Sequence, residues 1–128
     1  MKKFGGIVTA LLIAGLLTGA AVEPSAAAPS RAVRAFDGEW SVLINTTYGN
    51  CGSYRAALQI VGGRVVSNSQ DYAASGYVTG TGVTAVTVAS SVGNATGYGR
   101  LRGSVGGGQW QSAGGECAGT WSAERRGY

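Results

Sequence analysis

The feature that most constrains this chain is the two-residue alternation of residues 36–47, FDGEWSVLINTT. The even-numbered positions include Phe36, Gly38, Trp40, Val42 and Ile44 and form the apolar set. The odd-numbered positions are polar except for Leu43. Successive side chains of a β-strand point to opposite faces, so one face of this segment meets a core and the other meets water. Residues 54–61, YRAALQIV, repeat the pattern. The sequence therefore predicts half-buried strands.

The rest of the chain continues in short segments rich in Val, Thr and Tyr, separated by glycines, with no helical period. We predict further strands at residues 64–70, 74–80, 83–90, 95–103, 107–113 and 117–125, which makes eight. Eight short strands joined by short turns indicate an all-β fold, a small antiparallel up-and-down barrel, with a β-sandwich as the alternative. The expected inner face combines apolar side chains with several glycines.

The only two cysteines of the chain are Cys51 and Cys117, and they are not part of a Cys-x-x-Cys motif. Two such cysteines in an exported domain predict one disulfide. Cys51 follows the first predicted strand and Cys117 begins the last. Those two strands are neighbours in a closed eight-stranded barrel, so the disulfide is expected to fasten the closure at one rim.

All three tryptophans, Trp40, Trp110 and Trp121, follow a glycine by two positions. Residues two apart share a face, so a ring can lie over bare backbone at a glycine. This pattern has two interpretations: the rings fill the core, or the glycines leave a cavity in which the three tryptophans bind a ligand. We expect Trp40 and Trp121 to be tightly packed and Trp110, in a glycine-rich segment, to be partly wet.

The chain begins with Lys2 and Lys3, an apolar run and an alanine-rich segment, which is the pattern of a secretory signal peptide. We predict a signal peptide at residues 1–28, a short linker at 29–35 and the barrel domain at 36–126. The protein is therefore expected to be secreted or periplasmic.

The Gly-x-Trp of the first strand, the short Gly/Thr-rich strands and the last Gly-x-Trp resemble small exported barrels of the avidin-like and calycin type. The segments FDGEWSV, GRLRG and CAGTWSAERR also resemble a group of small exported bacterial all-β proteins of uncharacterised function. Secreted barrel-type protease inhibitors similarly open with a Gly-x-Trp strand and an early cysteine, but Cys117 comes much later than their second cysteine. These resemblances imply a barrel and no particular activity.

Catalysis is not expected, because the chain contains no histidine. Ser-His and Cys-His pairs and His-ligated metal sites are therefore excluded. Asp37 and Glu39 share the outward face of the first strand, where carboxylates are ordinarily solvated. We assign no catalytic, cofactor-binding or metal-binding residue and expect no cofactor.

Ten basic and six acidic residues give the chain a net charge of +4. Tyr98, Arg100 and Arg102 share the outer face of one predicted strand and form a candidate site for an anionic envelope polymer. Arg125 and Arg126 are expected elsewhere on the basic surface. We expect neither nucleic-acid binding nor membrane insertion after signal cleavage, because the apolar parity faces inward, opposite to a membrane barrel.

Together these features predict an exported, non-enzymatic binding protein of the bacterial envelope. Its partner is expected to be a small apolar ligand inside the barrel or a polymer outside. The alternatives are a secreted inhibitor of an extracellular enzyme, acting through the loop at residues 48–53, and a structural envelope component. The oligomeric state stays open.

Overall fold

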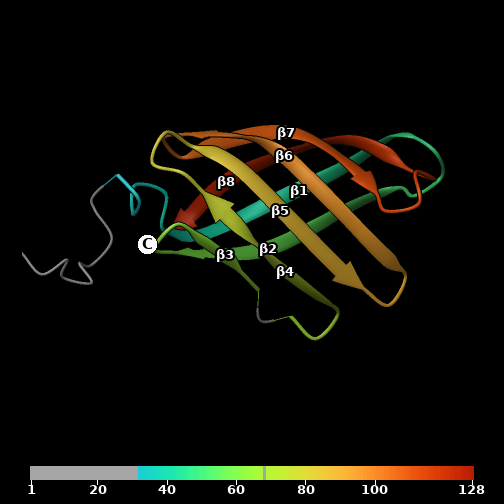
Figure 1. Cartoon of the computed structure of the whole chain (residues 1–128), viewed down its shortest axis with the longest axis horizontal. Helices are drawn as coiled ribbons and strands as arrows, with labels where there is room; N and C mark the ends of the chain where they lie inside the picture. Colours follow the sequence, from blue (N-terminus) through green and yellow to red (C-terminus); the bar gives the residue numbers. More distant parts are fainter. Residues whose placement is uncertain (1–31, 68) are drawn as a thin grey trace, which may run out of the picture.

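The computed structural model describes residues 32–128 except position 68, so the predicted signal peptide and most of the predicted linker lie outside the described residues. The described chain is all-β and forms a closed antiparallel barrel (Figure 1). Its strands are β1 (Gly38–Tyr48), β2 (Ser53–Val61), β3 (Arg64–Val66), β4 (Tyr72–Val78), β5 (Val83–Ser90), β6 (Gly93–Arg102), β7 (Val105–Ser112) and β8 (Ala118–Gly127). Within this described part, no helix is long and apolar enough to cross a membrane.

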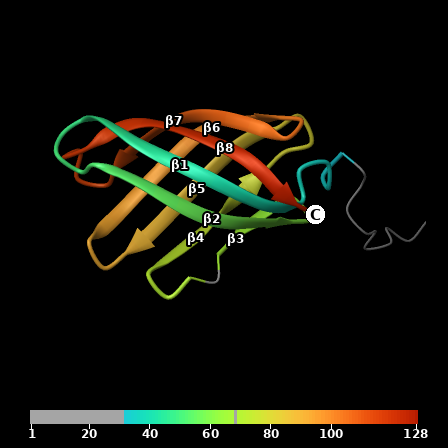
Figure 2. The same cartoon turned by 180° about the vertical axis from the view of Figure 1, so that it is seen from behind.

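The order of the strands around the barrel is their order in the sequence, because each strand pairs with the next and β8 pairs with β1. The up-and-down barrel prediction is therefore confirmed, and the sandwich alternative is wrong. The predicted disulfide is also confirmed: Cys51 and Cys117 are bonded, with their Cα atoms 6.2 Å apart. Cys51 belongs to the connection from β1 to β2 and Cys117 to the connection from β7 to β8. Both connections lie at the end of the barrel away from the chain's C-terminus (Figures 1 and 2). A disulfide is typical of proteins in oxidising compartments.

The third strand differs from its prediction, since the strand expected at residues 64–70 ends at Val66. Hydrogen bonds from the Ser67 side chain replace the ladder: its hydroxyl donates to the carbonyl of Tyr72 and accepts from the amide of Ala74. Serine side chains that bond to nearby backbone compete with strand pairing. The chain therefore leaves the sheet early and returns at Tyr72, two residues before the predicted start of the fourth strand.

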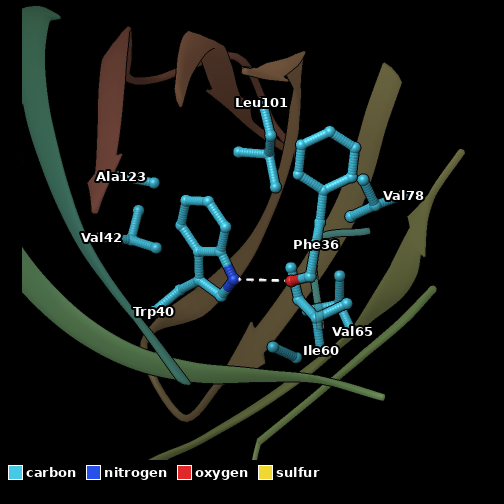
Figure 3. Packing of buried hydrophobic residues seen from close by; sticks show 9 residues of the cluster. Phe36, Trp40, Val42, Ile60, Val65, Val78, Leu101 and Ala123 are labelled. Atoms are coloured by element: carbon cyan, nitrogen blue, oxygen red, sulfur yellow. Dashed lines mark hydrogen bonds between the residues drawn. The ribbon is translucent and has the colours of Figure 1, made fainter. Parts of the chain in front are cut away.

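The core occupies the end of the barrel that holds the C-terminus. Residues 32–36, expected to lie largely in a linker, form turns that bring Phe36 into this end of the barrel. Figure 3 shows the Phe36 ring among side chains from several strands, next to Trp40, whose indole N–H donates to the Phe36 carbonyl at 2.8 Å. The buried hydrophobic residues are Phe36, Trp40, Val42, Ile60, Val65, Ala74, Val78, Leu101 and Ala123. This end of the barrel is closed, and we call it the closed end.

Arg125 fastens the closed end, contrary to its expected place on the basic surface. It is partly buried, and its guanidinium lies 5.2 Å from the Trp40 ring centroid. The same guanidinium donates to the carbonyls of Ala35 at 2.9 Å and Gly103 at 3.0 Å. Arg125 therefore ties the turn at residues 32–36 to β8 and to the turn after β6. Arg125 is an odd-numbered residue of β8, like the buried Ala123, and therefore points to the same inner face.

Asp37 is also structural and is not simply solvated on the outer face. Its carboxylate accepts the amide N–H groups of Gly62 at 2.7 Å and Gly63 at 3.1 Å, in the tight turn between β2 and β3. Both glycines have positive φ angles of 58° and 79°, a backbone conformation that favours glycine. The carboxylate thereby satisfies the donors of this turn.

Candidate functional site

The barrel interior is hollow toward the end opposite the C-terminus, where a cavity of about 770 Å³ opens to solvent. We call this opening the mouth. It is surrounded by the connections from β1 to β2, β3 to β4, β5 to β6 and β7 to β8 (Figure 1). Trp40, Ile60, Val78 and Leu101, which belong to the closed-end core, line the bottom of the cavity. Ligand sites for small molecules typically have volumes of about 300–1,000 Å³.

Most of the cavity wall is apolar, because most inward positions of the strands carry aliphatic, aromatic or small residues. The partly buried residues Ile44, Leu58, Val86 and Val88 pack on the core and also line the cavity. Small residues on β2 and β6 leave the space that larger side chains would occupy. Ala56, Ala95 and Gly97 are such positions.

The Gly-x-Trp units of β7 and β8 pair reciprocally across the two strands. Trp110 lies opposite Gly119, and Trp121 lies opposite Gly108. Each indole can therefore cross the neighbouring strand at a position without a β-carbon. The Trp110 N–H reaches the Asn45 carbonyl of β1 at 3.0 Å.

The ring of Trp121 crosses β7 in the same way and covers glycines of β6. Its N–H donates to the Tyr98 carbonyl at 3.2 Å. A β-carbon at Gly99 would lie 2.6 Å from the ring, and one at Gly97 would lie 3.4 Å from the indole nitrogen. The predicted stacking of tryptophan over glycine is therefore confirmed. It supports both interpretations of the motif, because the stacked rings also form a wall of the cavity.

The three tryptophans differ in burial. Trp40 is only 2% exposed and belongs to the core, as expected. Trp110 is partly buried, as expected for the tryptophan in the glycine-rich strand. Trp121 packs against the core, as expected, but it is only partly buried and also lines the cavity. Its two glycine neighbours on β6 have no side chains that could cover the ring.

The tryptophan indoles and the Thr84 hydroxyl inside the barrel already donate hydrogen bonds to the protein. The three indole N–H groups bond to backbone carbonyls, and the Thr84 hydroxyl donates to the Gly82 carbonyl at 2.9 Å. Nearer the mouth, the Tyr72 hydroxyl donates to the Ala57 carbonyl at 2.9 Å and accepts from the Ala57 amide at 3.0 Å. The deep wall therefore recognises a ligand by shape and apolar contact.

The barrel wall has few backbone hydrogen bonds between β2 and β4, because the short β3 pairs only with residues 59–61 of β2. Tyr72 spans this interval through its two hydrogen bonds to Ala57. Tyr54 and Arg55, on the part of β2 beyond β3, line the cavity here together with Asp71. The cavity therefore reaches toward the side of the barrel as well as the mouth.

The loop predicted as an inhibitory surface, residues 48–53, lies at the mouth. Tyr48 is 66% exposed, and Cys51 fastens the loop to the start of β8. The structure thus places this loop on the surface in a tethered form. Enzyme inhibition through it stays a prediction.

The candidate polyanion site lies on the outer wall, away from the cavity. Tyr98 is 61% exposed on β6 and pairs with Ala85 of β5, while Arg100 and Arg102 pair with Val83 and Val105 on its two sides. The three side chains share one face, as predicted. Polymer binding there stays a prediction.

Sequence reasoning missed Tyr72, Asp71 and Glu116 as cavity-lining residues. For Tyr72 a signal was present, because it has the same parity as Ala74 and Val78. The other two lie in the connections that surround the mouth, where alternation carries no information.

No protein-family model matches this chain, and it has no significant match among curated proteins. Function is therefore inferred from the geometry of the barrel.

Proposed function

We propose that this chain is an exported, non-enzymatic binding protein that holds a small apolar molecule inside its barrel. The observation that carries the proposal is the cavity of about 770 Å³, whose deep wall is apolar. Eight-stranded barrels of this size either fill their interior with side chains or hold one small ligand. Here glycine and alanine occupy inward positions at the mouth half, so space remains for a ligand.

The chemistry of the wall favours an apolar ligand over a polar one. Burying a polar group without a hydrogen-bond partner is unfavourable. The deep interior directs its indole and hydroxyl groups to backbone carbonyls. Trp110 and Trp121 offer aromatic surface against which a flat or aliphatic body can pack.

The absence of catalysis is part of this proposal. The chain has no histidine, and both cysteines are in the disulfide. A hydroxyl or thiol nucleophile activated by histidine is therefore impossible.

Export is supported by the predicted signal peptide at residues 1–28 and by the disulfide, which is typical of oxidising compartments. We infer that the mature protein resides in the periplasm or outside the cell. Mass spectrometry of the protein from its native cell is expected to find a new amino terminus between residues 21 and 30. An intact Met1 in the mature product would contradict export by signal cleavage.

The binding proposal is tested with N-phenyl-1-naphthylamine, a neutral apolar fluorophore that brightens in apolar surroundings. Titration of the oxidised protein is expected to give saturable enhancement at one site per chain. The variant Ala56→Phe adds a ring to an inward position that lines the cavity and should weaken binding at least about tenfold, since several apolar contacts are lost. The control Ala89→Phe adds the same ring on the exposed outer face of β5, at a residue that does not line the cavity, and should leave binding unchanged.

Circular dichroism verifies that both variants keep the fold of the parent. The proposal fails if the folded parent gives no saturable signal. It also fails if both variants bind as the parent does, because the fluorophore would then be bound outside the barrel.

A further inference from the structure

The two ends of this basic protein carry different charge. Most described arginines lie at or near the closed end: Arg34, Arg64, Arg100, Arg102, Arg125 and Arg126. By contrast, the charged residues in the connections around the mouth are Asp71 and Glu116, within the part of the chain that the structure describes. Both line the cavity. The mouth is therefore acidic although the whole chain has a net charge of +4.

Arg55 lies closest to the mouth among the described arginines, but its guanidinium is directed away from it. The side chain is on the outer face of β2, and its Nη1 donates to the Ser41 hydroxyl at 3.2 Å. The residue opposite Arg55 on β1 is Leu43, and Ser41 lies two residues farther toward the closed end. Arg55 also lines the cavity. Among the described residues, however, the one ion pair joins Arg126 and Glu124, so Arg55 is not paired with either carboxylate of the mouth.

The two carboxylates lie on opposite sides of the opening. Asp71 precedes β4 and Glu116 precedes β8, and these strands are four positions apart in the ring of eight. Glu116 accepts a hydrogen bond from the Ser112 hydroxyl at 2.9 Å, which orders it without neutralising it. Two aromatic side chains, Tyr54 and Tyr72, also line the cavity close to the mouth.

We propose that the cavity selects apolar molecules with a positively charged end, such as alkyl or aryl ammonium ions, and discriminates against carboxylates. The apolar body lies against Trp110 and Trp121, and the ammonium group stays at the mouth between Asp71 and Glu116. Carboxylates attract this cation through solvent, and aromatic faces add a cation–π contribution. This inference rests on the proposed binding function, because it assigns the chemistry of the ligand held in the same cavity.

The experiment compares three molecules with one tail and different heads: decylamine, decanol and decanoate. Each displaces N-phenyl-1-naphthylamine from the oxidised protein near neutral pH. We expect decylamine to bind more tightly than decanoate by roughly three- to thirtyfold at low salt, with decanol between them, since the two carboxylates attract one head and repel the other. In about 0.5 M salt the ratio should shrink, because exposed charges are then screened.

Two double variants with the same change in net charge isolate the mouth. Asp71→Asn with Glu116→Gln should bring the decylamine to decanoate ratio to within about twofold. Glu39→Gln with Glu124→Gln, on the exposed outer wall near the closed end, should leave the ratio of the parent.

The outcomes separate this inference from the proposed function. If the fluorophore does not bind the parent, the binding function itself fails. A second group of outcomes leaves the fluorophore site intact but refutes the charge selection. In these, the fluorophore binds the parent, and the three molecules displace it equally, or decanoate displaces it best, or none of them displaces it. Equal changes of the ratio in the two double variants would also overturn the inference, because net charge alone would then explain the preference.

Discussion

Breaking the Cys51–Cys117 disulfide perturbs the closure of the barrel more directly than any other covalent change. The two cysteines are 66 residues apart in the sequence. In the chain-entropy model, releasing a loop of that length raises the entropy of the unfolded chain enough to lower the free energy of unfolding by about 4 kcal/mol. Small domains have about 5–15 kcal/mol in total, so the loss is a large fraction.

Urea unfolding of the oxidised and the reduced parent protein, followed by tryptophan fluorescence, measures this loss. Reduction compares identical side chains, whereas Cys51→Ala with Cys117→Ala also removes contacts of the buried Cys117, which is 2% exposed. We expect reduction to cost about 4 kcal/mol and to increase the slope of the free energy against urea, because an open unfolded chain exposes more surface. The double variant should be slightly less stable than the reduced parent.

Thermal unfolding provides a second reading of the same quantity. For a domain of about 100 residues, 4 kcal/mol corresponds to a decrease in Tm of very roughly 15–30 °C. A loss below about 1 kcal/mol with an unchanged urea slope would refute the reasoning. The unfolded chain would then be equally compact with and without the bond.

Three further comparisons test the packing of the barrel and its basic outer face. Trp40→Ala should lower the free energy of unfolding by about 3–5 kcal/mol, and Trp110→Ala should lower it by about 1–2 kcal/mol less, because only Trp40 is fully packed. Equal losses of stability in calorimetry would contradict a hollow interior at the mouth half. Gly108→Ala should cost about 1–3 kcal/mol, since its β-carbon would lie 2.6 Å from the Gly99 Cα, and near-parent stability in urea would show that β6 moves freely. Arg100→Ala with Arg102→Ala should weaken salt-sensitive retention on heparin, and equal elution of parent and variant would remove this face as a polyanion site.

The strands with strong alternation could be predicted from the sequence, and those without it could not. Residues 36–44 alternate almost perfectly, and β1 has the expected inward face. The early end of β3 depends on hydrogen bonds of the Ser67 side chain, which composition does not reveal. Alternation specifies a face and does not specify which neighbour a residue will meet.

The hollow interior could be predicted only as one of two alternatives. Whether glycines leave space or receive a ring depends on the direction of side chains two strands away. The Trp121 ring covers Gly97 and Gly99 of β6, which are not its own motif's glycine. Arg125 similarly follows the inward parity of β8, but its contact with Trp40 requires the barrel to be closed.

The reciprocal pairing of tryptophans and glycines has a consequence for alignment of the strands. A strand such as β7, VGGGQWQS, offers little to prevent slippage, because glycine-rich strands specify their pairing weakly. A slip of two residues in one direction would set Trp110 opposite Trp121, and two indoles would compete for one site. A slip of two in the other direction would set Trp110 opposite Cys117. Of these three alignments, only the observed one places a glycine opposite each ring. The two Gly-x-Trp motifs together therefore fix the register between β7 and β8.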